Sequence, residues 1–175
     1  MASNVYTASN VVLGAASRVQ IGADGSYTAS DCPSVGYTKG DVVLTTTTTY
    51  AYKEPDQARG RVGAKFIEER AQVTVPLDEV TLANMAKALG YPTSAVAGGV
   101  LSFGGGSTNQ IYELWVVGDA PSSGTRTLHV HQCVPDGEKA YAMKKGEETV
   151  YEVTFECLQD TSQTAGEQIF QITDT

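Results

Sequence analysis

Five consecutive threonines, Thr45–Thr49, limit what the surrounding segment of this chain can form. β-Branching stiffens each side chain and disfavours a helix, whereas a pleated strand accommodates such residues well. We therefore predict a long strand over Val42–Tyr52, which at about 3.3 Å per residue spans roughly 35 Å. Because side chains alternate between the two faces of a strand, threonine makes both faces polar. At least one face is then expected to contact water or a partner instead of a core.

A second strand, Phe66–Val75, is expected to pair with the first across a loop of about residues 53–62. The two strands predict an extended β-hairpin with a charged tip. A solvated loop and a loop that contacts another molecule are both compatible with its composition. The charged residues of the loop are Lys53, Glu54, Asp56, Arg59 and Arg61.

One helix is predicted at about residues 78–89. Asp78 and Glu79 place negative charge in its first turn, and Gly90 suits the left-handed position after its last turn. Its apolar residues recur at helical spacing, and we interpret them as core packing and not as a cofactor site. They are Leu82, Met85, Ala86 and Leu89.

The rest of the chain consists of further predicted strands separated by turns, with no repeat or linker that would divide it. We therefore predict one mainly β domain over residues 1–175, behind a flexible N-terminal arm, Met1–Ser9. The further strands are expected at residues 10–21, 111–117, 126–134, 139–143, 149–158 and 168–172.

Composition narrows the functional classes. A chain of 175 residues with 41% apolar and 18% charged residues can bury a core and is not typical of disorder. The net charge of −8 argues against a nucleic-acid ligand, because such binding depends on neutralising phosphates. No secretory signal or apolar run of membrane-spanning length is seen, and an odd number of cysteines cannot all pair. We expect a soluble protein with reduced thiols and no membrane partner.

Catalytic patterns are few. The run Gly104–Ser107 lacks the lysine and hydroxyl residue of a phosphate-binding loop. Adjacent carboxylates such as Glu68 and Glu69 point to opposite faces of a strand, so they do not form an acid–base pair. We predict neither an enzyme nor a cofactor.

The sharpest cluster of potential ligands is His129-x-His131-x-Cys133. Alternate residues of a strand share a face, so these three side chains could converge on zinc. The sequence nominates no fourth ligand. The other interpretation is an ordinary half-buried strand whose second face carries Leu128 and Val130. A metal-dependent enzyme therefore stays as the less favoured alternative.

Several stretches share a recognisable order of small, apolar and charged residues: Gly36–Asp41, Val42–Tyr52, Glu68–Gly90, Lys145–Asp160 and Gln168–Ile172. Together they resemble the tail tube proteins of tailed bacteriophages, over most of the chain from about Val11. The resemblance implies a tail-tube-type β-sandwich or barrel with one flanking helix. It also implies hexameric rings that stack into a hollow tube through which viral DNA passes during ejection.

The resemblance further implies that the chief partner is the protein itself. Other tail proteins would join it, namely the tape measure, the terminator and the baseplate or tip proteins, and DNA would pass without specific binding. The protein would be made and assembled in the host cytoplasm and would reside in the virion tail. Another ring-forming virion protein, such as a tail terminator, a baseplate protein or a head-decoration protein, is the alternative.

Two sets of residues follow from this resemblance. The charged loop is expected to contact the neighbouring ring through the five residues given above. The bore is expected to be lined by polar strand residues that repel phosphate and let DNA slide, although each could be an ordinary solvated side chain. The predicted bore residues are Thr45, Thr47, Thr49, Glu68, Arg70, Gln72, Glu152 and Glu156.

Overall fold

A computed structural model describes residues 15–25, 28, 30–56, 59–105, 110–121, 123–143 and 145–175. The predicted N-terminal arm, Met1–Ser9, lies outside these residues. Within them the chain is mainly β, with a single α-helix. The elements are β1 (Arg18–Ala23), β2 (Val43–Lys53), β3 (Gly63–Leu77), α1 (Leu82–Ala88), the short 3-10 helix η2 (Thr93–Ala95), β4 (Tyr112–Asp119), β5 (Thr125–Asp136), β6 (Tyr151–Leu158) and β7 (Phe170–Asp174).

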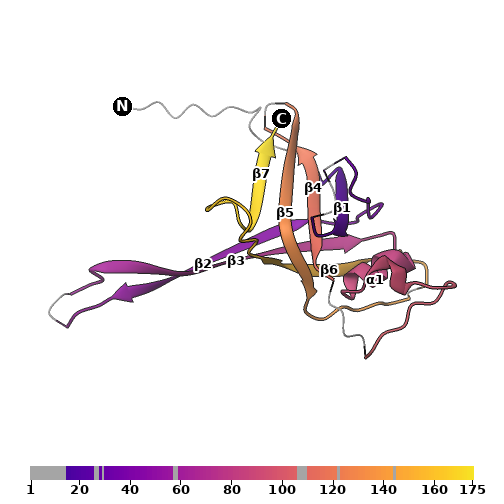
Figure 1. The fold of residues 1–175 in the computed structure, drawn as a ribbon, viewed down its shortest axis with the longest axis horizontal. Coiled ribbons are helices and arrows are strands. Elements are labelled where there is room, and N and C mark those ends of the chain that lie inside the picture. The colour runs from indigo at the N-terminus through magenta and orange to yellow at the C-terminus, as the bar shows by residue number, and fades with distance from the viewer. Residues whose placement is uncertain are drawn as a thin grey trace.

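All the described strands belong to one antiparallel sheet in the order β1-β4-β5-β6-β3-β2, with β7 pairing β5. β5 joins two parts of this sheet, because β7 pairs with its first half and β6 with its second half. The sheet curls there, so that β4, β5 and β7 cross the direction of β6, β3 and β2 (Figure 1). The predicted mainly β class is confirmed, and the observed architecture is one curled sheet.

A bulge marks the bend in β5. Leu114 of β4 pairs with Val130, but Tyr112, two residues earlier, pairs with Cys133, three residues later. The extra residue in β5 keeps both Val130 and Cys133 on the buried face, where neither is exposed. Residues two positions apart normally share a face of a strand, but across this bulge they lie on opposite faces.

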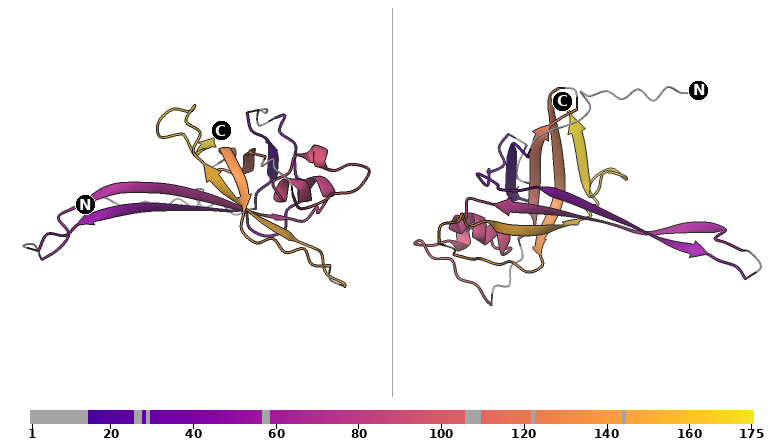
Figure 2. Two further views of the ribbon diagram at one scale, coloured as in Figure 1. Left: turned by 60° about the horizontal axis from the view of Figure 1, so that its bottom comes forward. Right: turned by 180° about the vertical axis from the view of Figure 1, so that it is seen from behind.

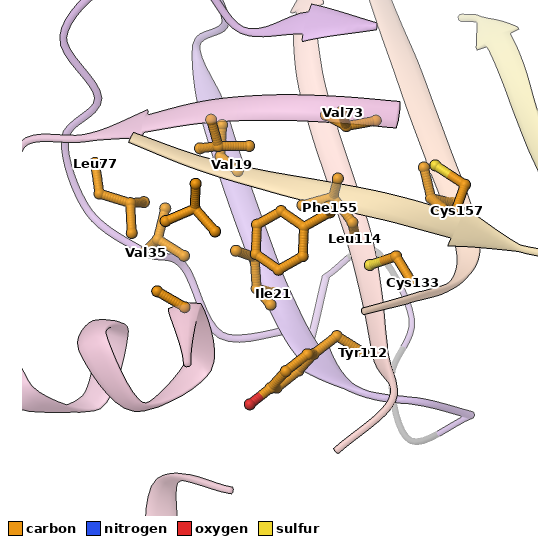
Figure 3. Close-up of a cluster of buried hydrophobic side chains, with 14 of the residues drawn as sticks. Val19, Ile21, Val35, Val73, Leu77, Tyr112, Leu114, Cys133, Phe155 and Cys157 are labelled. Atoms are coloured by element: carbon orange, nitrogen blue, oxygen red, sulfur yellow. The ribbon is translucent and has the colours of Figure 1, made fainter. Parts of the chain in front are cut away.

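The core fills the inner side of the curl (Figure 3). Phe155 lies at its centre, with side chains of β1, β3, β4 and β5 around it. The loop before β2 adds Val35, and α1 adds Ala88. The core is thus closed by a loop and one short helix, and most of its apolar surface comes from alternate residues of the strands.

The helix differs from its prediction at the first turn. Thr81 is its N-cap, and the Thr81 hydroxyl accepts a hydrogen bond from the Asn84 N–H at 3.2 Å. Glu79 lies before the helix, where its Oε1 accepts from the Tyr37 N–H at 3.0 Å. Gly90 ends the helix with φ 79°, as predicted. Within the predicted apolar stripe, Leu82 is exposed and Ala86 is buried.

Most predicted strands are confirmed within a few residues. The first one, predicted at residues 10–21, begins only at Arg18, because residues 15–17 are not in a strand and residues 10–14 lie outside the described part of the chain. One further prediction is wrong. Residues 139–143 form no strand. The Lys139 ammonium instead donates to the carbonyls of Asp136 and Gly137, in a turn that leaves β5. Among the described residues no helix has the length and apolar character needed to cross a membrane.

Candidate functional site: a polar sheet face and a projecting ribbon

The eight predicted bore residues share one face of β2, β3 and β6. Cross-strand neighbours lie on the same face of a sheet, so the register decides this directly. Glu152 lies four residues before Glu156 and therefore on the same face of β6. The opposed pairs are Thr45 with Gln72, Thr47 with Arg70, Thr49 with Glu68, and Gln72 with Glu156. We call this surface the polar face.

Hydrogen bonds fix part of the polar face. Gln72 Nε2 donates to Glu156 Oε2 at 2.7 Å. The Arg70 guanidinium lies 3.3 Å from Glu156 Oε1 and 3.8 Å from Glu68 Oε1. The face holds three carboxylates against one guanidinium and carries a net charge of −2. These contacts hold part of the face in place, and the face as a whole is acidic.

The polar face lies opposite the core. Val73, Val153 and Phe155, on the other side of the same strands, have no exposed surface. Glu152 and the threonines of β2 are exposed. In a single chain most of the polar face thus contacts water, while Gln72 and Glu156 are only partly exposed.

Beyond the core, β2 and β3 continue alone as a two-stranded ribbon (Figures 1 and 2). β3 pairs with β6 only from Gln72 to Leu77, so its residues 63–71 are bonded to β2 alone. β2 is the last strand of the sheet, and no described strand pairs with its outer edge. The ribbon therefore has two open edges, which favour pairing with further strands.

The face of the ribbon that continues from the core carries aromatic side chains. Tyr50 and Phe66 are cross-strand neighbours, and their rings meet edge to face with centroids 5.9 Å apart. They are 45% and 48% exposed, and the Ile67 side chain beside them is 58% exposed. The Arg61 guanidinium carbon lies over the Tyr52 ring, 3.9 Å from the ring centroid. Such a patch on an isolated ribbon is typical of an interaction surface.

The five predicted ring-contact residues lie at the tip of the ribbon. Arg61 Nε lies 2.6 Å from Glu54 Oε1, and both side chains are 60% exposed. An exposed pair of this kind contributes about 0–1 kcal/mol to stability. The tip is therefore placed by the ribbon and not by packing against the core.

No protein-family model matches this chain, and no curated protein matches it. Any functional conclusion therefore rests on the geometry of its own residues.

The zinc cluster that the sequence offered as the less favoured alternative does not form. The bulge in β5 places Cys133 in the core, on the opposite side of the strand from His129. Burial raises the pKa of the Cys133 thiol well above its usual value. Among the described residues there is no group of three or more histidine, cysteine or acidic side chains that could hold a metal. Alternation alone could not have revealed the bulge.

The two histidines instead join a buried polar cluster that the sequence did not predict. The His129 ring stacks on Trp115 with centroids 3.5 Å apart, and the His131 ring meets it edge to face at 4.4 Å. Burial, and next to it repulsion from His131, lowers the pKa of His129 to about 4. The neutral His129 ring then donates from Nε2 to Glu113 Oε1 at 2.7 Å. This cluster anchors the outer side of β4 and β5.

The three thiols are expected to resist alkylation in the folded protein. All three are free and buried, and burial raises the pKa of Cys32 to about 11 and that of Cys157 to about 12. Since the thiolate is the nucleophile, labelling by iodoacetamide at neutral pH should be at least about 100-fold slower than for an exposed cysteine. Mass spectrometry with and without denaturant would measure this. Rapid stoichiometric labelling of any cysteine without denaturant would contradict it.

Proposed function

We propose that this protein is a virion structural subunit whose rings stack into a hollow tail tube for DNA. The observation that carries the proposal is the ribbon of β2 and β3, which has two open edges and exposed aromatic residues on one face. The opposite face of the same strands is the acidic polar face. A surface for self-association and a surface for a water-filled bore thus lie on opposite faces of the same strands, with the aromatic residues nearer the tip.

Ring formation would satisfy the open strand edges. In a cyclic assembly each copy offers one edge to the next, so pairing continues until the ring closes. The curled sheet of each copy would then contribute to a continuous inner barrel, the tail-tube type of architecture. The aromatic face of each ribbon would be buried against a neighbouring copy. Ring assembly would thus cover both the open strand edges and the aromatic face, the two features that make the isolated chain prone to association.

The polar face is proposed to line the bore. Double-stranded DNA carries about one negative charge per 1.7 Å of its axis, so an acidic wall repels it and provides no binding site. Arg70, the one cation on this face, is near Glu68 and Glu156 and is not available to hold a phosphate tightly. DNA would slide through passively.

Negative-stain electron microscopy of the purified protein over a range of concentrations tests this function. Hollow filaments of stacked rings are the expected result. Isolated rings that never stack would favour a terminator, baseplate or head-decoration protein. Monomers at every concentration, including after addition of preformed tails as initiators, would contradict assembly.

Reversing the charge of the polar face is expected to impair DNA passage without preventing tube formation. The double variant Glu152→Lys with Glu156→Lys changes the charge by +4 per copy and should create phosphate-binding sites in the bore. DNA release from virions that carry the variant is the measurement. Normal release would contradict the sliding mechanism.

Two further variants separate charge from structure. Glu156 is hydrogen-bonded to Gln72, whereas Glu152 is exposed, so Glu152→Lys alone changes charge with little effect on folding. Asp119→Lys makes the same change of charge at the exposed end of β4, a strand that does not pair with β2, β3 or β6. We expect slower DNA release for the first variant and unchanged release for the second.

A further inference from the structure

A buried lysine lies at the end of the molecule opposite the ribbon. Lys87, in the last turn of α1, is only 6% exposed. Burial lowers the pKa of its ammonium group, and the Cys32 thiol opposes this effect only in part. Among the described residues, no hydrogen bond or ion pair involves this ammonium. The ammonium nitrogen is not fully enclosed, so it reaches the adjoining cavity without a complementary anion among the described residues.

Lys87 lines a cavity of about 550 Å³ between α1, β1 and the loop before β2. Several other polar groups around this cavity are already engaged. The Asn84 amide donates to the carbonyls of Val35 and Glu79, at 2.7 and 2.8 Å. The Tyr112 hydroxyl donates to the Tyr91 carbonyl. Lys87 is therefore the group of this cavity that an incoming carboxylate would meet.

The cavity is open at a rim that carries the opposite charge. Glu79 and Thr93, which also line the cavity, are exposed. The Glu79 carboxylate accepts from the Tyr37 N–H and so stays at the rim. A matching partner would bring a carboxylate to the interior and a cation to the edge.

The tip of the ribbon has this arrangement of charges. Glu54 is paired with Arg61, but the Asp56 carboxylate has no ion pair with the described residues. Arg59 follows in the same loop and is exposed. The tip and the α1 end lie at opposite ends of the longest axis of the molecule (Figures 1 and 2). One chain therefore presents the two complementary surfaces far apart.

We propose that the ribbon tip of one copy docks in the Lys87 cavity of a second copy, with Asp56 as the carboxylate that pairs with Lys87. This inference rests on the proposed self-assembly and names the receiving surface. Because the contact joins opposite ends of the molecule, it is heterologous and can repeat from copy to copy. Arg59 would lie near Glu79 at the rim, and the Lys87 ammonium would gain a counter-ion.

Carbodiimide crosslinking of the assembled protein tests this pairing. The reagent activates the Asp56 carboxyl group, the Lys87 amine attacks the activated carbon, and an amide forms as the urea leaves. A mixture of ¹⁵N-labelled and unlabelled copies should give crosslinked peptides of mixed isotope content, which shows that the bond joins two chains. Asp56→Asn should abolish this crosslink. Asp119→Asn, at the exposed end of β4, should leave it unchanged.

Charge reversal provides a second readout. Asp56→Lys lies on an exposed loop, so the variant should fold normally, and we expect the concentration for half-assembly to rise at least about tenfold. Assembly with wild-type affinity, or a crosslink from Lys87 to another carboxylate, would overturn the docking while leaving the proposed function intact. If the wild-type protein never assembles, the proposed function and this inference both fail.

Discussion

Replacing Phe155 by alanine is expected to lower the free energy of unfolding by about 3–5 kcal/mol, the usual cost of removing a buried aromatic ring. Phe155 is 0% exposed and is among the largest fully buried side chains. Its ring meets Tyr112 edge to face, with centroids 6.5 Å apart. Since the strands around it are paired in one sheet, the cavity left behind cannot collapse easily.

Urea unfolding followed by circular dichroism, at a concentration where the protein is monomeric, measures this change. Phe103→Ala is the matched control, because that side chain is 76% exposed and its loss should change stability by about 0.5 kcal/mol or less. A loss below about 1 kcal/mol for Phe155→Ala would mean that the core is not centred on this residue.

The elements that local chemistry determines were predictable. Threonines strongly favour a strand, and the charged loop of about residues 53–62 leads into a second one, so the hairpin of β2 and β3 followed from the sequence. That the bore residues share a face also followed from the sequence. Alternate residues of one strand lie on the same side, and the pairing register aligns these sides across neighbouring strands. Whether that surface lines a bore depends on other copies of the chain.

The elements that tertiary contacts determine were not predictable. The β5 bulge that moves Cys133 into the core depends on how β4 and β6 pair with the same strand. The later start of α1 depends on Glu79 bonding to Tyr37, which is distant in sequence. The burial of Lys87 and Glu113 could not be predicted from the sequence either, because charged residues are normally assigned to the surface.

Removing the two aromatic rings of the ribbon is expected to prevent assembly while leaving the fold intact. In Tyr50→Ser with Phe66→Ser, both changes lie in the part of the ribbon that does not pair with β6. Buried aromatic residues commonly contribute 2 kcal/mol or more each at an interface, so the double variant should raise the concentration for half-assembly by roughly 100-fold or more. Sedimentation velocity and electron microscopy over a concentration series would measure this.

The ribbon supplies its own matched control, because the next cross-strand pair lies on the opposite face. Ala51 faces Lys65, and Ala51→Ser with Lys65→Ser changes the same two strands one residue further along. If the aromatic face is the interface, only the Tyr50 and Phe66 variant loses assembly, and both variants unfold at the wild-type denaturant concentration. If both variants assemble like the wild type, the aromatic face is not an interface. If both fail equally, the loss of assembly is not specific to the aromatic face, and the prediction is wrong.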